Sequence, residues 1–166
     1  MKKINFVNNS EPYLSAENFN QLQTNIEEAF AKNVISASLK SDYTLTTTNT
    51  YELIPLDDFV SVGDKLTLEN NKIKIGAGIT KILISARVGL PGATVGSKNF
   101  VIRKSGTICG RVWTKIDTAH NECMVINNTL IDAKENDLID IALYGNVGDR
   151  ISANAVFTIL TVEVVA

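Results

Sequence analysis

The stretch Leu66-Thr67-Leu68-Glu69-Asn70-Asn71-Lys72-Ile73-Lys74-Ile75 decides the fold class of this chain. Apolar and polar residues alternate on both sides of the central Asn pair, which is the period of a half-buried β-strand. Asn tolerates a positive φ, so two Asn residues between alternating segments predict a tight two-residue hairpin. A second hairpin is predicted farther along, where Ser105-Gly106 separates residues 100–104 from residues 107–109.

The rest of the chain after Tyr43 follows the same pattern. We expect longer strands over residues 80–88, 123–131, 138–144 and 157–165. Gly, Pro, Asn and Asp mark the turns, at residues 76–78, 91–92, 134–137 and 145–149. Because no helical period interrupts these strands, the sequence predicts a mainly β, two-sheet antiparallel sandwich and not βαβ units.

Several of the predicted strands are apolar on both faces, among them residues 82–84, 124–126 and 157–165. A sandwich strand with one face in water should instead alternate. Two interpretations stay open: another subunit covers the outer face of a sheet, or the N-terminal part of the chain lies over it.

The first part of the chain differs in composition from the rest, and the change falls between Asn33 and Ser41. We therefore predict an N-terminal segment over residues 1–40 and a β domain over residues 41–166. Ser15 suits a helix N-cap, and apolar residues then recur at three- and four-residue intervals, which predicts a helix over about 15–33. The apolar stripe consists of Phe19, Leu22, Ile26, Ala29 and Phe30. A helix this short must dock on its own domain, on copies of itself or on a larger assembly.

The charge balance excludes two kinds of partner. The formal net charge is −2 and the pI about 5.4, so we expect no nucleic-acid partner, since that would need an excess of Lys and Arg. There is no polybasic cluster for an anionic membrane and no apolar run of the roughly 18 residues that span one, so we expect no membrane insertion. The apolar run of residues 4–7 is too short for a signal peptide, which predicts synthesis in a cytoplasm.

No motif of catalysis is found in the sequence. It contains no G-x-S-x-G, H-E-x-x-H or C-x-x-C pattern, and we predict that the protein is not an enzyme and uses no cofactor. The single His120 has no metal-ligand spacing around it, so no metal site is expected. The acidic residues Asp132, Glu135, Asp137 and Asp140 lack the pattern of a calcium loop and are expected to be solvated turn carboxylates.

Cys109 and Cys123 both fall in predicted strands. A disulfide between neighbouring strands is one alternative. A reducing cytoplasm favours the other, two free and largely buried thiols.

Four residues are candidates for ligand binding. Trp113, the only tryptophan, stands beside a polar loop, where it is either a core residue or a platform for stacking a sugar ring. Tyr144 has the same two interpretations, and Asn146 follows it in the Gly-rich loop. His120 lies in another polar stretch, where a solvated loop histidine is the alternative to a ligand contact.

Two parts of the chain resemble known families. Residues 4–12 and the segment Leu14-Ser15-Ala16-Glu17-Asn18-Phe19-Asn20-Gln21-Leu22-Gln23-Thr24-Asn25-Ile26 resemble the N-terminal segment of minor structural and fibre proteins of phages that infect Gram-positive bacteria. In those virion proteins the segment leads into a variable domain. The resemblance implies attachment to other virion proteins, and it covers about the first 30 residues.

The remainder resembles the jelly roll of the complement globular-head and tumour necrosis factor superfamily. The similar stretches are residues 60–64, 66–75, 82–88, 133–141 and 157–164. Asn136 stands where that family usually has Gly, and the last stretch resembles the family's final strand, near its three-fold axis. The resemblance implies a homotrimer, but no ligand-binding residue of the family transfers to a matching position.

Together these features predict a phage virion protein, assembled in the host cytoplasm. It would be a tail-fibre or other receptor-binding component whose trimeric jelly roll binds a host surface carbohydrate. The alternative is a head fibre or capsid decoration protein with a purely structural role. A wall-degrading hydrolase is a third interpretation.

Overall fold

The computed structural model describes residues 20–24, 26 and 32–166, and the chain divides into two compact units, Met1–Lys32 and Asn33–Ala166. In the first unit, residues 20–24 and 26 are helical, inside the range expected for the helix. Leu22 and Ile26 are exposed, while the other members of the apolar stripe lie outside the described residues. No helix in the described part of the chain is long and apolar enough to cross a membrane.

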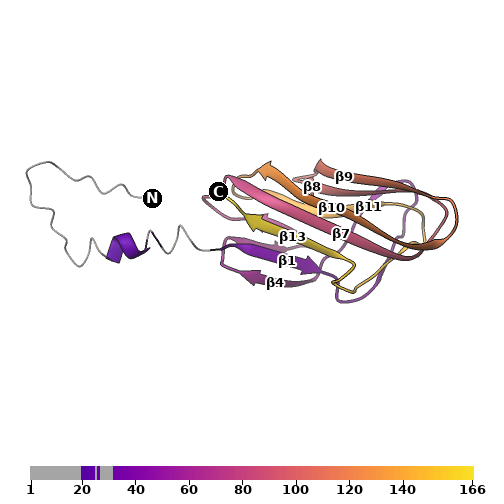
Figure 1. Ribbon diagram of the computed structural model, residues 1–166, viewed down its shortest axis with the longest axis horizontal. Coiled ribbons are helices and arrows are strands. Elements are labelled where there is room, and N and C mark those ends of the chain that lie inside the picture. The colour runs from indigo at the N-terminus through magenta and orange to yellow at the C-terminus, as the bar shows by residue number, and fades with distance from the viewer. Residues whose placement is uncertain (1–19, 25, 27–31) are drawn as a thin grey trace, which may run out of the picture. The chain divides into compact units, whose positions relative to one another are not determined.

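The second unit is a sandwich of two antiparallel sheets (Figure 1). The first sheet has the order β10-β7-β13-β1-β4, with bounds His120–Asp132, Lys81–Ala93, Ile159–Val164, Val34–Ser38 and Asp58–Val62. The second has the order β5-β6-β11-β8-β9, with bounds Leu66–Glu69, Lys72–Ile75, Leu138–Tyr144, Gly96–Lys104 and Thr107–Ile116. β3 (Tyr51–Leu53) also pairs with β11, and β2 (Tyr43–Thr44) pairs with β12 (Arg150–Ile151). The predicted two-sheet antiparallel sandwich is confirmed.

Both predicted hairpins are confirmed. Asn70 and Asn71 have φ of 50° and 64° and join β5 to β6, and Ser105 and Gly106 have φ of 47° and 86° and join β8 to β9. Asn136, which stands where the resembled family has Gly, has a φ of 67°. Asn is one of the few residues other than Gly that enter this left-handed region at low cost.

One predicted turn and the predicted start of the β domain differ from the structure. The chain does not turn at Pro91-Gly92: β7 continues through both residues and bulges against β10, where Gly92 donates its N–H to the Asn121 side chain. The sandwich begins at Asn33 and not at residue 41, because β1 lies between β13 and β4.

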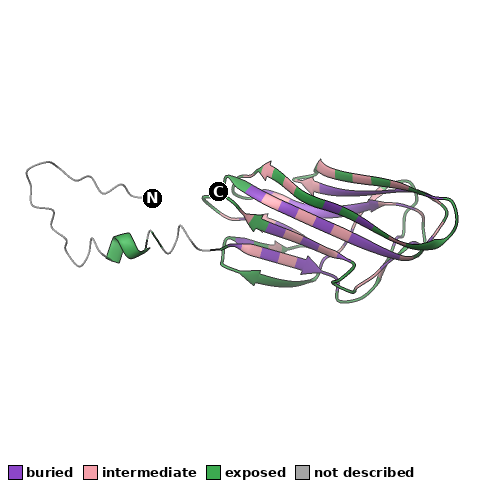
Figure 2. Cartoon of the chain, viewed as in Figure 1, coloured by how far each residue is buried: buried purple, intermediate pink, exposed green. Residues whose placement is uncertain are grey.

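The core lies between the two sheets. Along β7 and β13 buried residues alternate with more exposed ones, visible as bands in Figure 2. Fully buried side chains meet from both layers, including Ile82, Ile84, Leu160 and Val162 from the first sheet and Phe100, Ile102, Ile139 and Ile141 from the second.

The two thiols are free, and only one of them is partly buried. Cys109 is half-buried, and its burial raises the pKa of the thiol. Cys123 is exposed, so the expectation that both thiols are buried was wrong for this residue. The reason is its place on the outer side of β10, opposite Gly89 of β7.

Candidate ligand-binding surface

An aromatic row crosses the outer face of the second sheet. Strand register places Tyr51, Tyr144, Asn99 and Trp113 side by side on β3, β11, β8 and β9. Neighbouring strands lie about 4.8 Å apart, so the row is about 14 Å long. Three of its four residues are aromatic, and they come from parts of the sequence far from one another.

Trp113 is 56% exposed, so the core interpretation of this residue was wrong. Side chains alternate along β9, and the neighbours Val112 and Ile116 are the ones that turn inward. A large aromatic ring is thus left on the surface, at one end of the row.

At the other end, the rings of Tyr51 and Tyr144 lie 5.7 Å apart between centroids and are inclined at 56°. The Tyr144 hydroxyl donates to Asn49 Oδ1 at 3.0 Å, which sets the orientation of its ring. Two inclined rings with polar hydroxyl tips combine apolar faces with hydrogen-bonding edges.

Arg111 contacts two members of the row. Its Nε donates to Asn99 Oδ1 at 3.0 Å, and its Nη2 donates to the Tyr51 hydroxyl at 3.0 Å. Asn99 is buried, and Arg111 is exposed. The guanidinium is therefore held in one orientation on the surface by two neutral acceptors.

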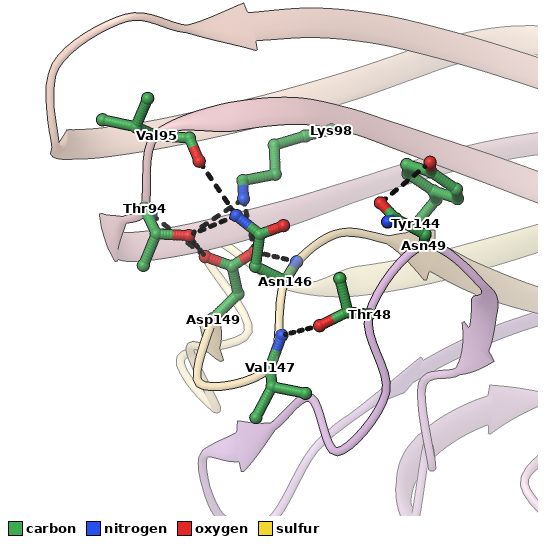
Figure 3. Close-up of polar contacts among 9 residues, drawn as sticks. All are labelled: Thr48, Asn49, Thr94, Val95, Lys98, Tyr144, Asn146, Val147 and Asp149. Atoms are coloured by element: carbon green, nitrogen blue, oxygen red, sulfur yellow. Dashed lines mark hydrogen bonds and ion pairs between the residues drawn. The ribbon is translucent and has the colours of Figure 1, made fainter.

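A buried ion pair lies next to the loop that follows Tyr144 (Figure 3). Lys98 Nζ lies 2.5 Å from Asp149 Oδ2, and neither side chain is exposed at all. Burial alone would raise the pKa of Asp149, but the hydrogen bonds from Lys98, from the backbone N–H of Asn146 and from Thr94 outweigh it and hold that pKa below its usual value. The carboxylate is thus charged and fully bonded inside the protein.

This ion pair fixes the loop of residues 145–149. Asn146 donates its backbone N–H to Asp149, and its side-chain NH2 donates to Thr94 Oγ1 and to the Val95 carbonyl. Gly145 is required in the loop, since a Cβ there would lie 2.6 Å from an Asp149 carboxylate oxygen. The side-chain NH2 of Asn146 is therefore engaged within the protein, and the ligand contact expected for this residue stays a prediction.

The same loop supports the aromatic row. The Asn49 N–H donates to the Gly145 carbonyl, and the Val147 N–H donates to Thr48 Oγ1. Asn49 in turn accepts from Tyr144, as Figure 3 shows. The buried pair, the loop and the end of the row form one connected arrangement.

His120 lies elsewhere, at the start of β10 in the first sheet. Its ring is exposed, and hydrogen bonds with the Thr118 carbonyl and then with Glu122 raise its pKa. The structure therefore brings two of the four predicted residues, Trp113 and Tyr144, into one row and leaves His120 outside it.

Sequence patterns alone did not point to Tyr51, Asn99 or Arg111. The alternation Arg111-x-Trp113-x-Lys115 is the one signal that could have placed Arg111 beside the tryptophan on one face of a strand. Tyr51 and Asn99 join the row only through strand register, which the sequence does not reveal.

No metal site is found in the described part of the chain. Among these residues, no group of three or more His, Cys, Asp or Glu side chains could hold a metal ion. Two of the acidic residues expected to be solvated are in fact buried. Asp137 accepts from Ser105 and from the backbone N–H of Lys134, and Asp140 is paired with Arg103 and Lys72. Their burial follows from the pairing of β11 between β6 and β8.

A second polar centre orders the segment that precedes β3. Glu52 accepts hydrogen bonds from the Tyr43 hydroxyl and from the N–H and hydroxyl groups of Thr46 and Thr47. Burial acts to raise the pKa of Glu52, but these bonds lower it to about 2. Burial and the contact with Glu52 together raise the pKa of Tyr43 to about 12.

We expect Glu52→Gln to reduce the acid sensitivity of the fold. Folding lowers the pKa of Glu52 from an ordinary 4.5 to about 2. As the pH falls, the unfolded chain therefore binds a proton at Glu52 at a higher pH than the folded chain does. Its stabilising contribution is complete above pH 4.5 and is lost as the pH falls towards 2. The wild-type Tm should therefore fall more between pH 4.5 and 2.5 than the Tm of the variant, measured by circular dichroism.

Glu69→Gln is the control for the change in net charge, since Glu69 is an exposed carboxylate with Lys74 as its partner. Equal losses of Tm in the wild type and in Glu52→Gln would contradict the prediction.

Comparison with known proteins gives a fold but no family. No protein-family model matches the chain, and no curated protein matches it. Among solved structures, murine APRIL in crystals at pH 5.0 superposes with a TM-score of 0.66 at 10% identity, over 81% of this chain and 99% of that one. The fold is a tumour-necrosis-factor-like jelly roll.

Eiger TNF from S. frugiperda has the same fold, with a TM-score of 0.58 at 6% identity, over 82% of this chain and 92% of that one. This confirms the jelly roll that the sequence resemblance implied. At such low identity the likeness extends to the fold alone.

Proposed function

We propose that this protein is a homotrimeric, non-enzymatic binding component of a phage particle, and that its aromatic row binds host surface carbohydrate. The row of Tyr51, Tyr144, Asn99 and Trp113 is the observation that carries the proposal.

A carbohydrate suits the chemistry of this row. Pyranose rings have apolar faces that stack on aromatic rings. The hydroxyl groups at their edges form hydrogen bonds with polar side chains. Trp113 offers an exposed ring, and the Tyr51 hydroxyl and Arg111 offer donors in the same part of the sheet. The row is longer than one sugar ring, so it favours a short oligosaccharide.

The trimer is supported by the outer face of the first sheet, which is apolar for a surface. Its exposed side chains include Val60 and Val62 of β4 and Val125 and Leu130 of β10. Apolar patches of this kind mark sites of association. In Figure 2 the whole of β4 is drawn as exposed.

Beside these residues is a hollow of about 480 Å³, lined in part by Arg87, Val125, Phe157 and Ile159. The Arg87 Nε in it is buried yet has no hydrogen-bond partner in the described part of the chain. A buried donor without an acceptor costs about 1–3 kcal/mol. A second copy of the chain seated on this face would cover the apolar residues and could supply an acceptor.

The virion setting is supported by the N-terminal resemblance to phage fibre proteins. Three copies of the row on one trimer would bind a repeating surface polysaccharide with avidity, so each site needs only modest affinity. A tail fibre or another receptor-binding component is the role that this arrangement fits. The N-terminal segment would attach it to other virion proteins.

We expect Trp113→Ala to reduce retention on host cells or on purified cell-wall polysaccharide by about tenfold or more, because loss of one stacking ring weakens all three sites together. Retention is measured by co-sedimentation of the full chain at equal protein concentration. Ile108→Ala is the matched control, since Ile108 is an exposed apolar residue of the same strand.

Equal retention of Trp113→Ala and the wild type would overturn the carbohydrate site. Binding to capsids without any binding to wall polysaccharide would instead favour a decoration protein. Turnover of the purified wall would contradict the non-enzymatic role.

A further inference from the structure

The guanidinium of Arg111 lacks a counter-charge, which separates it from most cations of the sandwich. Arg103 and Lys72 both pair with Asp140, and Arg150 pairs with Asp42. Arg111 contacts Asn99 and Tyr51, both neutral, and no carboxylate lies within ion-pair distance of it among the described residues. It is a cation held in place without an anion.

The geometry leaves part of this cation available. A guanidinium has five N–H donors, and Asn99 and Tyr51 accept from two of its nitrogen atoms. The remaining donors have no partner in the described part of the chain, and the side chain is exposed. The Tyr51 hydroxyl, which accepts from Arg111, keeps its own hydrogen to donate outward.

The carboxylates near Arg111 on this face are already paired with other cations. Asp140, the carboxylate on the outer side of β11, is already paired with two cations, Arg103 at 2.5 Å and Lys72 at 3.4 Å. Lys115, four positions after Arg111 and on the same side of β9, pairs with Asp117 at 3.3 Å. The nearby carboxylates are therefore already paired, and Arg111 keeps an unpaired charge although the chain as a whole has a formal net charge of −2.

We infer that the aromatic row recognises an acidic saccharide, in which Arg111 binds a carboxylate or phosphate oxygen while Trp113 stacks on a sugar ring. The guanidinium fork matches the planar pair of oxygens of a carboxylate and two oxygens of a phosphate. Because two neutral side chains hold the fork in place before the ligand arrives, little side-chain entropy is lost on binding. This inference rests on the proposed carbohydrate site and names its ligand class.

The test compares three probes on the full chain by isothermal titration: a neutral oligogalactan, an oligogalacturonate and a glycerol-phosphate polymer. We expect at least one acidic probe to bind about tenfold or more tightly than the neutral one, with an affinity that falls as salt rises. The stronger of the two acidic probes distinguishes a carboxylate ligand from a phosphodiester.

The variant Arg111→Gln should lose this preference and keep the affinity for the neutral probe within about twofold. Arg111→Lys retains the charge but not the fork, so it should recover only part of the preference. Lys134→Gln is the matched control, since Lys134 lies in the turn before β11, away from the row.

The outcomes separate the two proposals. Equal binding of neutral and acidic probes by the wild type, or an unchanged preference in Arg111→Gln, would overturn the acidic ligand and leave the carbohydrate site standing. Binding of none of the three probes would overturn both. Because the comparison of probes is made on the wild type, it holds even if a variant fails to fold.

Discussion

Asp149→Asn should lower the free energy of unfolding by about 3–5 kcal/mol, the cost of breaking a buried ion pair by removing one partner. The amide has the shape of the carboxylate but places an NH2 group among donors. The Asp149 carboxylate accepts from Lys98, from the backbone of Asn146 and from Thr94, so an amide would leave at least one of them unpaired and the Lys98 ammonium without a counter-charge.

This prediction is checked by urea unfolding followed by circular dichroism, at one fixed protein concentration because an oligomer unfolds in a concentration-dependent way. The matched control is Asp132→Asn. That carboxylate is 86% exposed and pairs with Lys81 at 3.5 Å, so its loss should cost less than about 1 kcal/mol.

A loss in Asp149→Asn no larger than the loss in Asp132→Asn would mean that the pair does not hold the loop. A second consequence would accompany the expected result. Because the loop supports Asn49 and through it Tyr144, carbohydrate binding should weaken in Asp149→Asn at temperatures where the protein is still folded.

Leu130→Glu should convert the proposed trimer to monomers. Leu130 is 56% exposed on β10, opposite Leu83 of β7, on the apolar face proposed for assembly. Glu163 lies next to Leu83 in the same row of that face, so three copies would bring together several carboxylates in an apolar interface. Burying an unpaired charge costs several kcal/mol for each ion. We expect this cost to exceed the free energy that holds the trimer together.

Light scattering of the full chain measures this directly. We expect three times the chain mass of 18.1 kDa for the wild type and a single chain mass for Leu130→Glu at micromolar concentration. Val95→Glu is the control, since Val95 is also 56% exposed but lies in the turn between β7 and β8. A monomeric wild type would contradict the proposed trimer. A trimeric Leu130→Glu would show that the interface lies on another face.

The agreement between sequence and structure is best where the signal is local. Asn70-Asn71 and Ser105-Gly106 need only their own backbone conformations to form turns, and the predicted strand over residues 138–144 matches β11 at both ends. Pro91-Gly92 misled the prediction because a bulge and a turn use the same residues, and the difference depends on whether β10 lies alongside.

The candidate site follows the same division. Local patterns identified Trp113 and Tyr144 as aromatic residues next to polar loops, but not the side of the sheet they occupy. They also grouped Asn146 with these two, although its side-chain NH2 is taken up by Thr94 and the Val95 carbonyl. A hydrogen bond between residues about fifty positions apart leaves no trace in local composition.

The class of fold could be predicted from the residues alone, because strand periodicity and turn residues act over a few neighbouring positions. The site, in contrast, exists only in the folded chain. The register of β3, β11, β8 and β9 brings Tyr51, Tyr144, Asn99 and Trp113 into one row, and the buried Lys98–Asp149 pair holds one end of it. Register depends on contacts between distant segments, and a shift of one residue would turn every one of these side chains to the other face.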